Sequence, residues 1–194
     1  MSLTVKNKAL LRACWRCQSG APAVEFALIA PVLILLMLAG IDTVRYVLFH
    51  QKTERIAYTV ADLVSQSETL MQSDLQQIAL SAPQLMQPFR FDSNGVVIVT
   101  SVYRGDTGTQ TARWRYVGGG TLNRISRVGN LNATATLPNN LILNARDNVI
   151  VAEVYYQFQP FFPLLDLTSL KNITDIYKVA VFKPRLGALT TTPL

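Results

Sequence analysis

The chain has 194 residues, 49% of them hydrophobic and only 15% charged, with a formal net charge of +6. This length is typical of one folded domain plus a short extra segment, and so low a charged fraction indicates a membrane-spanning helix. Four of the 18 basic residues lie in positions 1–20, which hold no acid, so the remaining 14 basic residues face 12 acidic ones, a net of +2. The excess charge therefore indicates membrane topology and argues against a nucleic-acid partner.

Residues 1–20 are predicted to be a basic leader that stays in the cytoplasm. The leader holds both cysteines, Cys14 and Cys17, in a Cys-x-x-Cys pattern. A zinc half-site or a redox pair is conceivable, but the only histidine, His50, lies beyond the apolar segment, so one chain cannot supply four ligands. We therefore expect no metal and no cofactor, and no disulfide after the leader.

Residues 21–41 contain a single charged side chain, Glu25. About 21 residues at about 1.5 Å each span roughly 30 Å, the thickness of a bilayer core. The best small-residue cleavage position, after Gly20, precedes this segment, so a retained anchor is favoured over a removable signal peptide. We predict a transmembrane helix over 21–49, with Pro22 in its first turn and a kink at Pro31.

The apolar pattern continues beyond the anchor, and a second, amphipathic helical segment is predicted from residue 45 to about 70. Ile56, Val60, Leu63 and Ser67 should share one face of it. A second helix is expected to start with a capping box at Ser73 and Gln76 and to end near residue 81, before Pro83. A short helix is expected over 121–128.

The second half of the chain is rich in β-branched and aromatic residues that alternate with polar ones. Trp114 and Tyr116, for example, alternate with Arg113 and Arg115. Four antiparallel strands are expected, over 96–103, 111–117, 149–158 and 176–183. The predicted fold class is α+β: a long N-terminal transmembrane and amphipathic helix packed on a small antiparallel sheet, with a periplasmic domain over 50–194.

Catalytic patterns were tested against the same residues. His50 alone offers no base within a cleft, and the glycines of 118–120 lack the Lys-Ser/Thr ending of a phosphate loop. The acidic turns at 92–95 and 106–108 lack the spacing of a calcium loop. We expect no enzymatic activity. The pair Phe161 and Phe162, which lies between two prolines, is a candidate exposed contact, whereas the strand aromatics should pack in the core.

The stretch from Gly20 to Pro31, Gly-Ala-Pro-Ala-Val-Glu-Phe-Ala-Leu-Ile-Ala-Pro, resembles the N-terminus of TadE/TadG-like pseudopilins of the tight-adherence (Flp, type IVc) pilus system. The segments 55–66, 85–89 and 151–156 and the terminal Lys-Pro-Arg of 183–185 are similar as well. The resemblance covers most of residues 19–185. Its most specific part is the glycine at position 20, the acid at position 25 and the apolar helix that follows.

This resemblance implies that a membrane prepilin peptidase cuts after Gly20 and leaves Ala21 as the new N-terminus. Glu25, followed by Phe26, would then help the subunit to enter the assembly by neutralising the amine of Ala21 in its own or a neighbouring chain. The alternative for Glu25 is an interfacial acid that reaches the headgroups. Pro22 departs from the small residue or threonine expected there, and it should slow the cut.

The expected function is that of a minor pseudopilin of a tight-adherence pilus, which supports pilus biogenesis, surface adhesion and biofilm formation. Its expected partners are the prepilin peptidase, other pilins and pseudopilins, and the inner-membrane assembly platform. It should cross a bacterial inner membrane once, with its N-terminus in the cytoplasm. An uncleaved, single-pass periplasmic binding module that never enters a pilus is the alternative.

Overall fold

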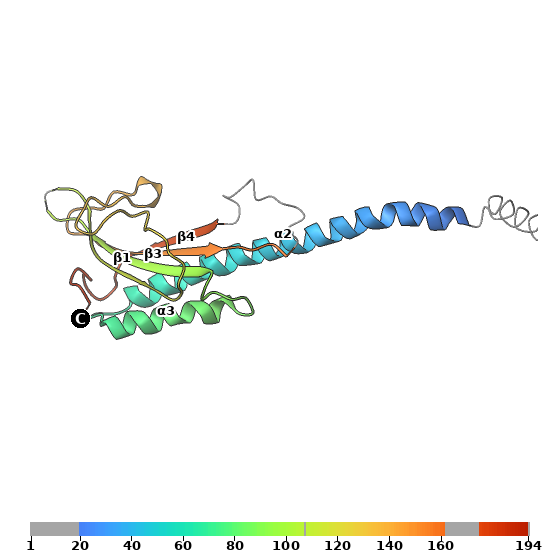
Figure 1. Cartoon of the computed structure of the whole chain (residues 1–194). Coiled ribbons are helices and arrows are strands. Elements are labelled where there is room, and N and C mark those ends of the chain that lie inside the picture. Colours follow the sequence, from blue (N-terminus) through green and yellow to red (C-terminus); the bar gives the residue numbers. More distant parts are fainter. Residues whose placement is uncertain (1–19, 107, 162–174, 194) are drawn as a thin grey trace, which may run out of the picture. The chain divides into compact units, whose positions relative to one another are not determined.

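The computed structural model describes residues 20–106, 108–161 and 175–193. The chain forms two compact units, Met1–Thr43 and Val44–Leu194. One helix, α2, contributes to both of them, and the remaining elements belong to the second unit (Figure 1). In chain order the elements are α2 (Ala21–Ser65), α3 (Gln72–Met86), β1 (Gly95–Tyr103), β2 (Thr111–Gly118), the 3-10 turn η2 (Pro138–Asn140), β3 (Asn148–Gln157) and β4 (Asp175–Phe182).

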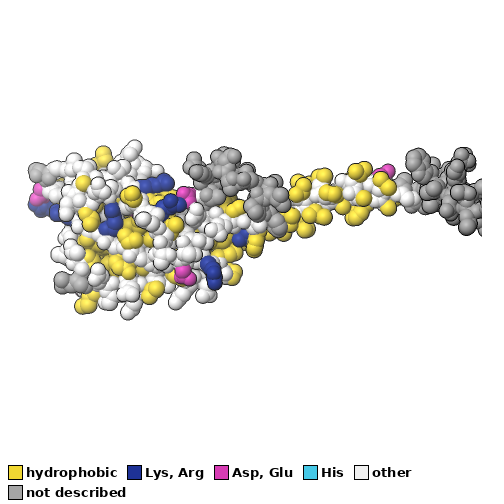
Figure 2. All heavy atoms as spheres, in the orientation of Figure 1, with side chains coloured by type: hydrophobic (Ala, Val, Ile, Leu, Met, Phe, Trp, Pro, Cys, Tyr) yellow, Lys and Arg dark blue, Asp and Glu magenta, His cyan; other side chains and the backbone are white. Residues whose placement is uncertain are grey.

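The described part of the first unit is the N-terminal half of α2. Its large apolar side chains are exposed on every side of the helix, as Figure 2 shows for one face. A helix that is hydrophobic all round suits a bilayer, where its backbone groups are already paired within the helix. Among the described residues this is the one helix long and apolar enough to cross a membrane. It continues without interruption through Pro31.

The second unit is built on a four-stranded sheet with the order β2-β1-β3-β4, in which every neighbouring pair is antiparallel. Val99 lies opposite Ala152, and Ala152 lies opposite Ala180. A bulge interrupts the pairing of β1 with β2 between Ser101 and Val102. All four strands begin and end within one residue of their predicted bounds, and the α+β class is confirmed.

The main core lies between one face of this sheet and the helices. Ile56, Val60 and Val64 of α2 are fully buried there and recur every four residues. They share a cluster with alternate strand residues such as Val97 and Val154. Leu63, predicted on the same face as Ile56 and Val60, is exposed. The buried residues of α2 follow a four-residue spacing, which leads from Val60 to Val64 and passes over Leu63.

The second helix, α3, is longer than predicted. It begins after Met71, whose backbone N–H donates to the Asp74 carboxylate over 3.0 Å, so the cap lies before Ser73. It also continues through Pro83 to Met86, and the predicted end near residue 81 was wrong. Pro83 lies in the last turn, where few backbone bonds are lost, and burial of Ala82 and Met86 holds that turn in place.

The opposite face of the sheet is covered by the long connections between strands. The helix predicted over 121–128 is absent, and these residues form an irregular loop that ends in a turn. The cause is a tertiary contact: the side chain of Ser126 and the backbone N–H of Arg127 both donate to the buried Glu153 of β3. A helical turn there would direct these donors to its own carbonyls instead.

Candidate functional site

The N-terminal end of α2 holds the residues that the sequence marks as a processing site. Gly20 is exposed and immediately precedes the helix, which starts at Ala21. No atom lies within 4 Å of the position that a Cβ on Gly20 would occupy. The bond between Gly20 and Ala21 is therefore at the boundary of the helix, where backbone N–H groups lack partners within the helix.

Glu25 lies one helical turn after Ala21, and Phe26 follows it. Both side chains are exposed in the chain alone, in common with Val24 and Leu28. Residues four apart on a helix lie on the same face, so Glu25 lies on the side of the helix that begins at position 21. The structure thus places the predicted assembly residues next to the predicted processing site on one accessible helix end.

The two prolines of this segment differ in position. Pro22 is the second residue of α2, where the missing N–H removes no bond within the helix. Pro31 lies nine residues further along, inside the helix. Cys14 and Cys17, the other candidates near this end, lie outside the described residues. Within the described ranges no three side chains of His, Cys, Asp or Glu gather in a way that could hold a metal ion.

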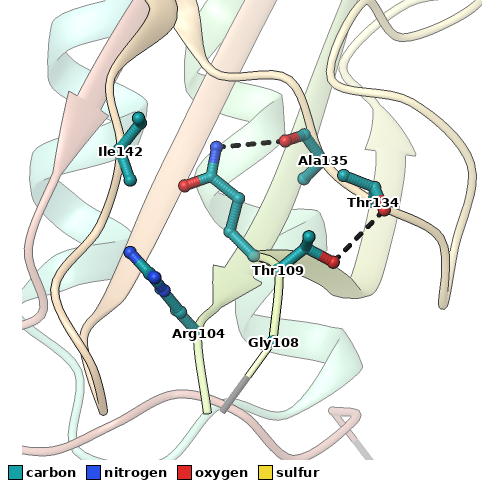
Figure 3. Close-up of a pocket in the computed structure, with 7 residues that line it drawn as sticks. Arg104, Gly108, Thr109, Thr134, Ala135 and Ile142 are labelled. Carbon is teal, nitrogen blue, oxygen red and sulfur yellow. Dashed lines mark hydrogen bonds between the residues drawn. The ribbon is translucent and has the colours of Figure 1, made fainter. Parts of the chain in front are cut away.

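Two hollows in the second unit are further candidate binding sites. One, of about 240 Å³, lies between the β1–β2 connection and the loop layer (Figure 3). Its polar groups already serve the fold: the amide of Gln110 donates to the carbonyls of Ala135 and Leu141, each over 3.1 Å, and the hydroxyls of Thr109 and Thr134 lie 3.3 Å apart. These hydrogen bonds therefore stabilise the loops, and the described residues around the hollow present no convergent set of unused polar groups.

The second hollow, of about 340 Å³, is lined by Arg127, Tyr177 and both apolar and polar residues of the 121–128 loop, β4 and the η2 region, Thr136 and Asn139 among them. The Arg127 guanidinium carbon lies 4.0 Å from the centre of the Tyr177 ring. Neither of the two hollows is lined by a His, Cys, Asp or Glu side chain.

The sequence reasoning missed a buried carboxylate beside this hollow. Glu153 is fully buried in the central strand β3. It accepts hydrogen bonds from Ser126, from the N–H of Arg127 over 2.9 Å, and from the hydroxyls of Tyr155 and Tyr177 over 3.3 and 3.1 Å. The signal in the sequence is an acid inside an apolar strand, Val-Ala-Glu-Val.

The two tyrosines are affected by this environment. Burial, and secondly the negative charge of Glu153, raise the pKa of Tyr155 to about 12. The same two causes raise the pKa of Tyr177 further above its ordinary value. Both hydroxyls therefore remain protonated donors to the carboxylate at any physiological pH. This cluster ties the loop 121–128 to the sheet, and it has the character of a structural anchor.

A comparison with protein families bears on the N-terminal segment. The family described as TadE-like protein matches residues 20–62 of this chain, which confirms the resemblance to TadE-like proteins for this part. No curated protein and no solved structure matches the chain. The matched range starts at Gly20 and includes Glu25, Phe26 and both prolines. It indicates a membrane-associated component of a tight-adherence pilus system.

Proposed function

We propose that the chain is a minor pseudopilin of a tight-adherence pilus, cut after Gly20 and retained by its N-terminal helix. The observation that carries the proposal is the arrangement at that end: an exposed glycine at the helix boundary, then an apolar segment, 21–41, that is long enough to cross a bilayer and has an acid in its second turn as its one charge. This is also the part of the chain that the TadE-like family matches. Through pilus biogenesis the protein would support surface adhesion and biofilm formation.

The proposed location is the bacterial inner membrane. The basic leader favours a cytoplasmic N-terminus, so residues 50–194 face the periplasm. Partners follow from that position: the prepilin peptidase at the cytoplasmic end of α2, other pilins and pseudopilins along the helix, and the inner-membrane assembly platform. We propose a structural role with no catalysis, and the lining of the two hollows supports it.

Glu25 would act through its charge. A cut after Gly20 creates an ammonium at Ala21, and both this group and the carboxylate are costly within a bilayer when alone. Pairing them, within one chain or between neighbouring subunits, reduces both costs. Exposure of Glu25 and Phe26 in the chain alone leaves them available to a neighbouring helix.

The processing step is tested by N-terminal sequencing of the protein extracted from membranes of cells with and without their prepilin peptidase. We expect a start at Ala21 only when the peptidase is present. Gly20→Val should abolish the cut, whereas Gly40→Val, which changes a glycine inside α2 with equally open surroundings, should leave it intact. A start at Met1 or Ser2 in both strains would show an uncleaved single-pass anchor instead.

The assembly step needs a second variant. Glu25→Gln should be cut normally but should lower the amount of pilus sheared from cells, because the amine of Ala21 loses its counter-charge. Glu68→Gln, which removes an exposed acid just beyond α2, is the matched control. Equal pilus yields from the Glu25 variant and the control would contradict the proposed role of Glu25.

A further inference from the structure

The sheet of the second unit has two edge strands, β2 and β4, which differ in how they are covered. At the β2 edge the segment 131–134 forms bridges with Thr111 and Ala112, and a bulge interrupts the pairing of β2 with β1. At the β4 edge, no backbone hydrogen bond from the described residues reaches the outer side of the strand (Figure 1). Every second residue of an edge strand directs its N–H and C=O away from its partner strand. β4 therefore presents a row of unpaired backbone donors and acceptors.

The usual protections of a sheet edge are missing from β4. The strand contains no proline, and its register with β3 is unbroken over all eight residues. Its one lysine, Lys178, has its Nζ 2.9 Å from the Glu54 carboxylate of α2, so this side chain turns to the helix and does not guard the edge. A regular edge without a bulge, a proline or a free charge is suited to pairing with another strand.

The hollow of about 340 Å³ lies beside this edge, on the face of the sheet that the loops cover. Tyr177 and Val179 line it from β4, and Pro138 and Asn139 line it from the η2 region. Side chains directly opposite each other on paired strands have their Cβ atoms about 4.5–5.5 Å apart. A strand added to β4 would therefore place a side chain next to Tyr177 and Val179, at the hollow.

Arg127 gives the hollow a positive charge. Its guanidinium carbon lies 4.0 Å from the centre of the Tyr177 ring, and within the described residues the group has no hydrogen bond or ion pair. Arg124 of the same loop differs, because it is paired with Asp175 over 2.6 Å. Glu153 accepts four other donors and does not line the hollow. A guanidinium stacked on a ring keeps its N–H donors in one plane, where they match a carboxylate.

We propose that β4 binds an extended peptide segment of another protein by strand addition, and that an acidic side chain of this segment enters the hollow and pairs with Arg127. Backbone hydrogen bonds along β4 supply affinity, and the hollow supplies selectivity for the acid. A second copy of this chain is a poorer occupant, because its β2 edge holds Arg113 and Arg115 and no acid. The inference goes beyond the proposed function and depends on neither cleavage nor pilus assembly.

The test uses the full chain in detergent and a fluorescein-labelled nonapeptide in which threonine and valine alternate and glutamate replaces the central threonine. Fluorescence anisotropy measures its binding, and the same peptide with glutamine at the centre is the reference. We expect the glutamate peptide to bind about tenfold more tightly, because its carboxylate accepts charge-assisted hydrogen bonds. No saturable binding of the glutamate peptide, or equal binding of the two peptides, would overturn the proposal.

Arg127→Gln should weaken binding of the glutamate peptide to the level of the glutamine peptide, with far-UV circular dichroism unchanged. Arg113→Gln is the matched control, since Arg113 is exposed and its guanidinium carbon lies 5.3 Å from the centre of the Tyr103 ring at the other edge of the sheet. This control should bind as the unaltered chain does. Undiminished binding by Arg127→Gln, or an equal loss in both variants, would contradict a site at Arg127.

Strand addition is tested separately by hydrogen exchange and mass spectrometry. Amides of 175–182 should exchange more slowly once the glutamate peptide is bound, while those of 111–118 should not change. Peptide binding without protection of 175–182 would show an acid bound in the hollow alone and would overturn strand addition. Protection of 175–182 that rises with the concentration of the chain itself, without peptide, would overturn the proposal in favour of a second copy.

Discussion

At the scale of single residues, Glu153 is the side chain with the largest expected effect on stability. Its carboxylate is fully buried, and four donors from three segments of the chain converge on it. Hydrogen bonds to a buried charge are stronger than neutral ones, and the donors lose their acceptor when the charge is removed. The cluster thus joins the loop 121–128 and strand β4 to the centre of the sheet.

We predict that Glu153→Gln lowers the free energy of unfolding by about 2 to 3 kcal/mol. The glutamine side chain would place its NH2 group, a donor, against hydroxyl and N–H groups that now donate to the carboxylate. Urea unfolding of the full chain in detergent, followed by circular dichroism, measures this change. Asp175→Asn is the control: it removes an exposed partner of Arg124, whose pair should contribute at most about 1 kcal/mol. Equal effects of the two variants would contradict the anchoring role of Glu153.

The tyrosines of this cluster predict a dependence on alkaline pH. The pKa of Tyr155 is about 12 in the folded chain and about 10 when unfolded, so the unfolded chain releases its proton first. The stabilisation is complete below pH 10 and is lost as the pH rises from 10 through 12. Absorbance at 295 nm should therefore show a late-ionising component in the folded chain.

The origin of that late component can be assigned by substitution. Tyr155→Phe should reduce it and should flatten the fall in stability above pH 10. Tyr58→Phe, which removes a half-exposed tyrosine of α2 remote from Glu153, should leave it in place. A late component that persists unchanged in Tyr155→Phe would show that its environment differs from the one described.

At the scale of elements, the contact between α3 and the end of β2 depends on one glycine. Gly119 has φ +77°, in the left-handed region, and a Cβ there would lie 2.8 Å from the backbone oxygen of Ala79 in α3. Gly119→Ala should lower the free energy of unfolding by more than about 1 to 2 kcal/mol, since the left-handed conformation alone costs that much. Gly187→Ala, in open surroundings, should be nearly neutral in the same urea titration.

A loss at Gly119→Ala no larger than the cost of the left-handed conformation, about 1 to 2 kcal/mol, would mean that α3 moves away from β2 without cost. A larger loss, absent from Gly187→Ala, would show that the two elements pack as one unit. The side chain of Ala79 is buried, and α3 has neighbouring buried residues at Leu75 and Ala82, so we expect little freedom to shift.

The elements also show what local sequence could and could not predict. The strands were predicted to within one residue because β-branched alternation is a local property. The long first helix was predicted for the same reason, through its uncharged stretch and its apolar spacing. The loop 121–128 was missed because its conformation depends on Glu153, 27 residues after Ser126. The length of α3 was missed because packing outweighed the local preference against Pro83.

The C-terminal segment was beyond local prediction for a similar reason. The Leu189 carbonyl accepts from Ser101 over 2.6 Å and from Trp114 over 2.9 Å, and its N–H donates to Asn148 over 3.0 Å. Nothing in residues 186–193 has strand or helix character, so the three strands that hold Leu189, namely β1, β2 and β3, define its course. The N-terminal candidate site could be predicted because its features are local: a glycine, an acid and an uncharged run. The contacts of Arg45 with aromatic rings could not, since they join α2 to residues more than a hundred positions later.

At the scale of the whole molecule, the distribution of charge along the chain should decide which side of the membrane receives the second unit. The leader holds four basic residues and no acid, whereas the first basic residues after the apolar stretch are Arg45, Lys52 and Arg55. Orientation follows the difference in Lys and Arg between the two flanks. Replacing the four leader residues by Gln reverses that difference and should place the second unit on the cytoplasmic side in a substantial fraction of molecules. The four are Lys6, Lys8, Arg12 and Arg16.

Orientation can be measured with Ile142→Cys, an exposed position of the second unit, in a chain with Cys14→Ser and Cys17→Ser. A membrane-impermeant maleimide should label this cysteine in intact spheroplasts and should label much less of it once the leader is neutral. The matched control exchanges Lys and Arg among the four leader positions, which keeps the charge and should keep the labelling. Full labelling of the neutral-leader chain would show that the length and apolarity of α2, and not the leader charge, determine the orientation. The proposed cytoplasmic position of Gly20, which the proposed cleavage requires, would then need a different physical cause.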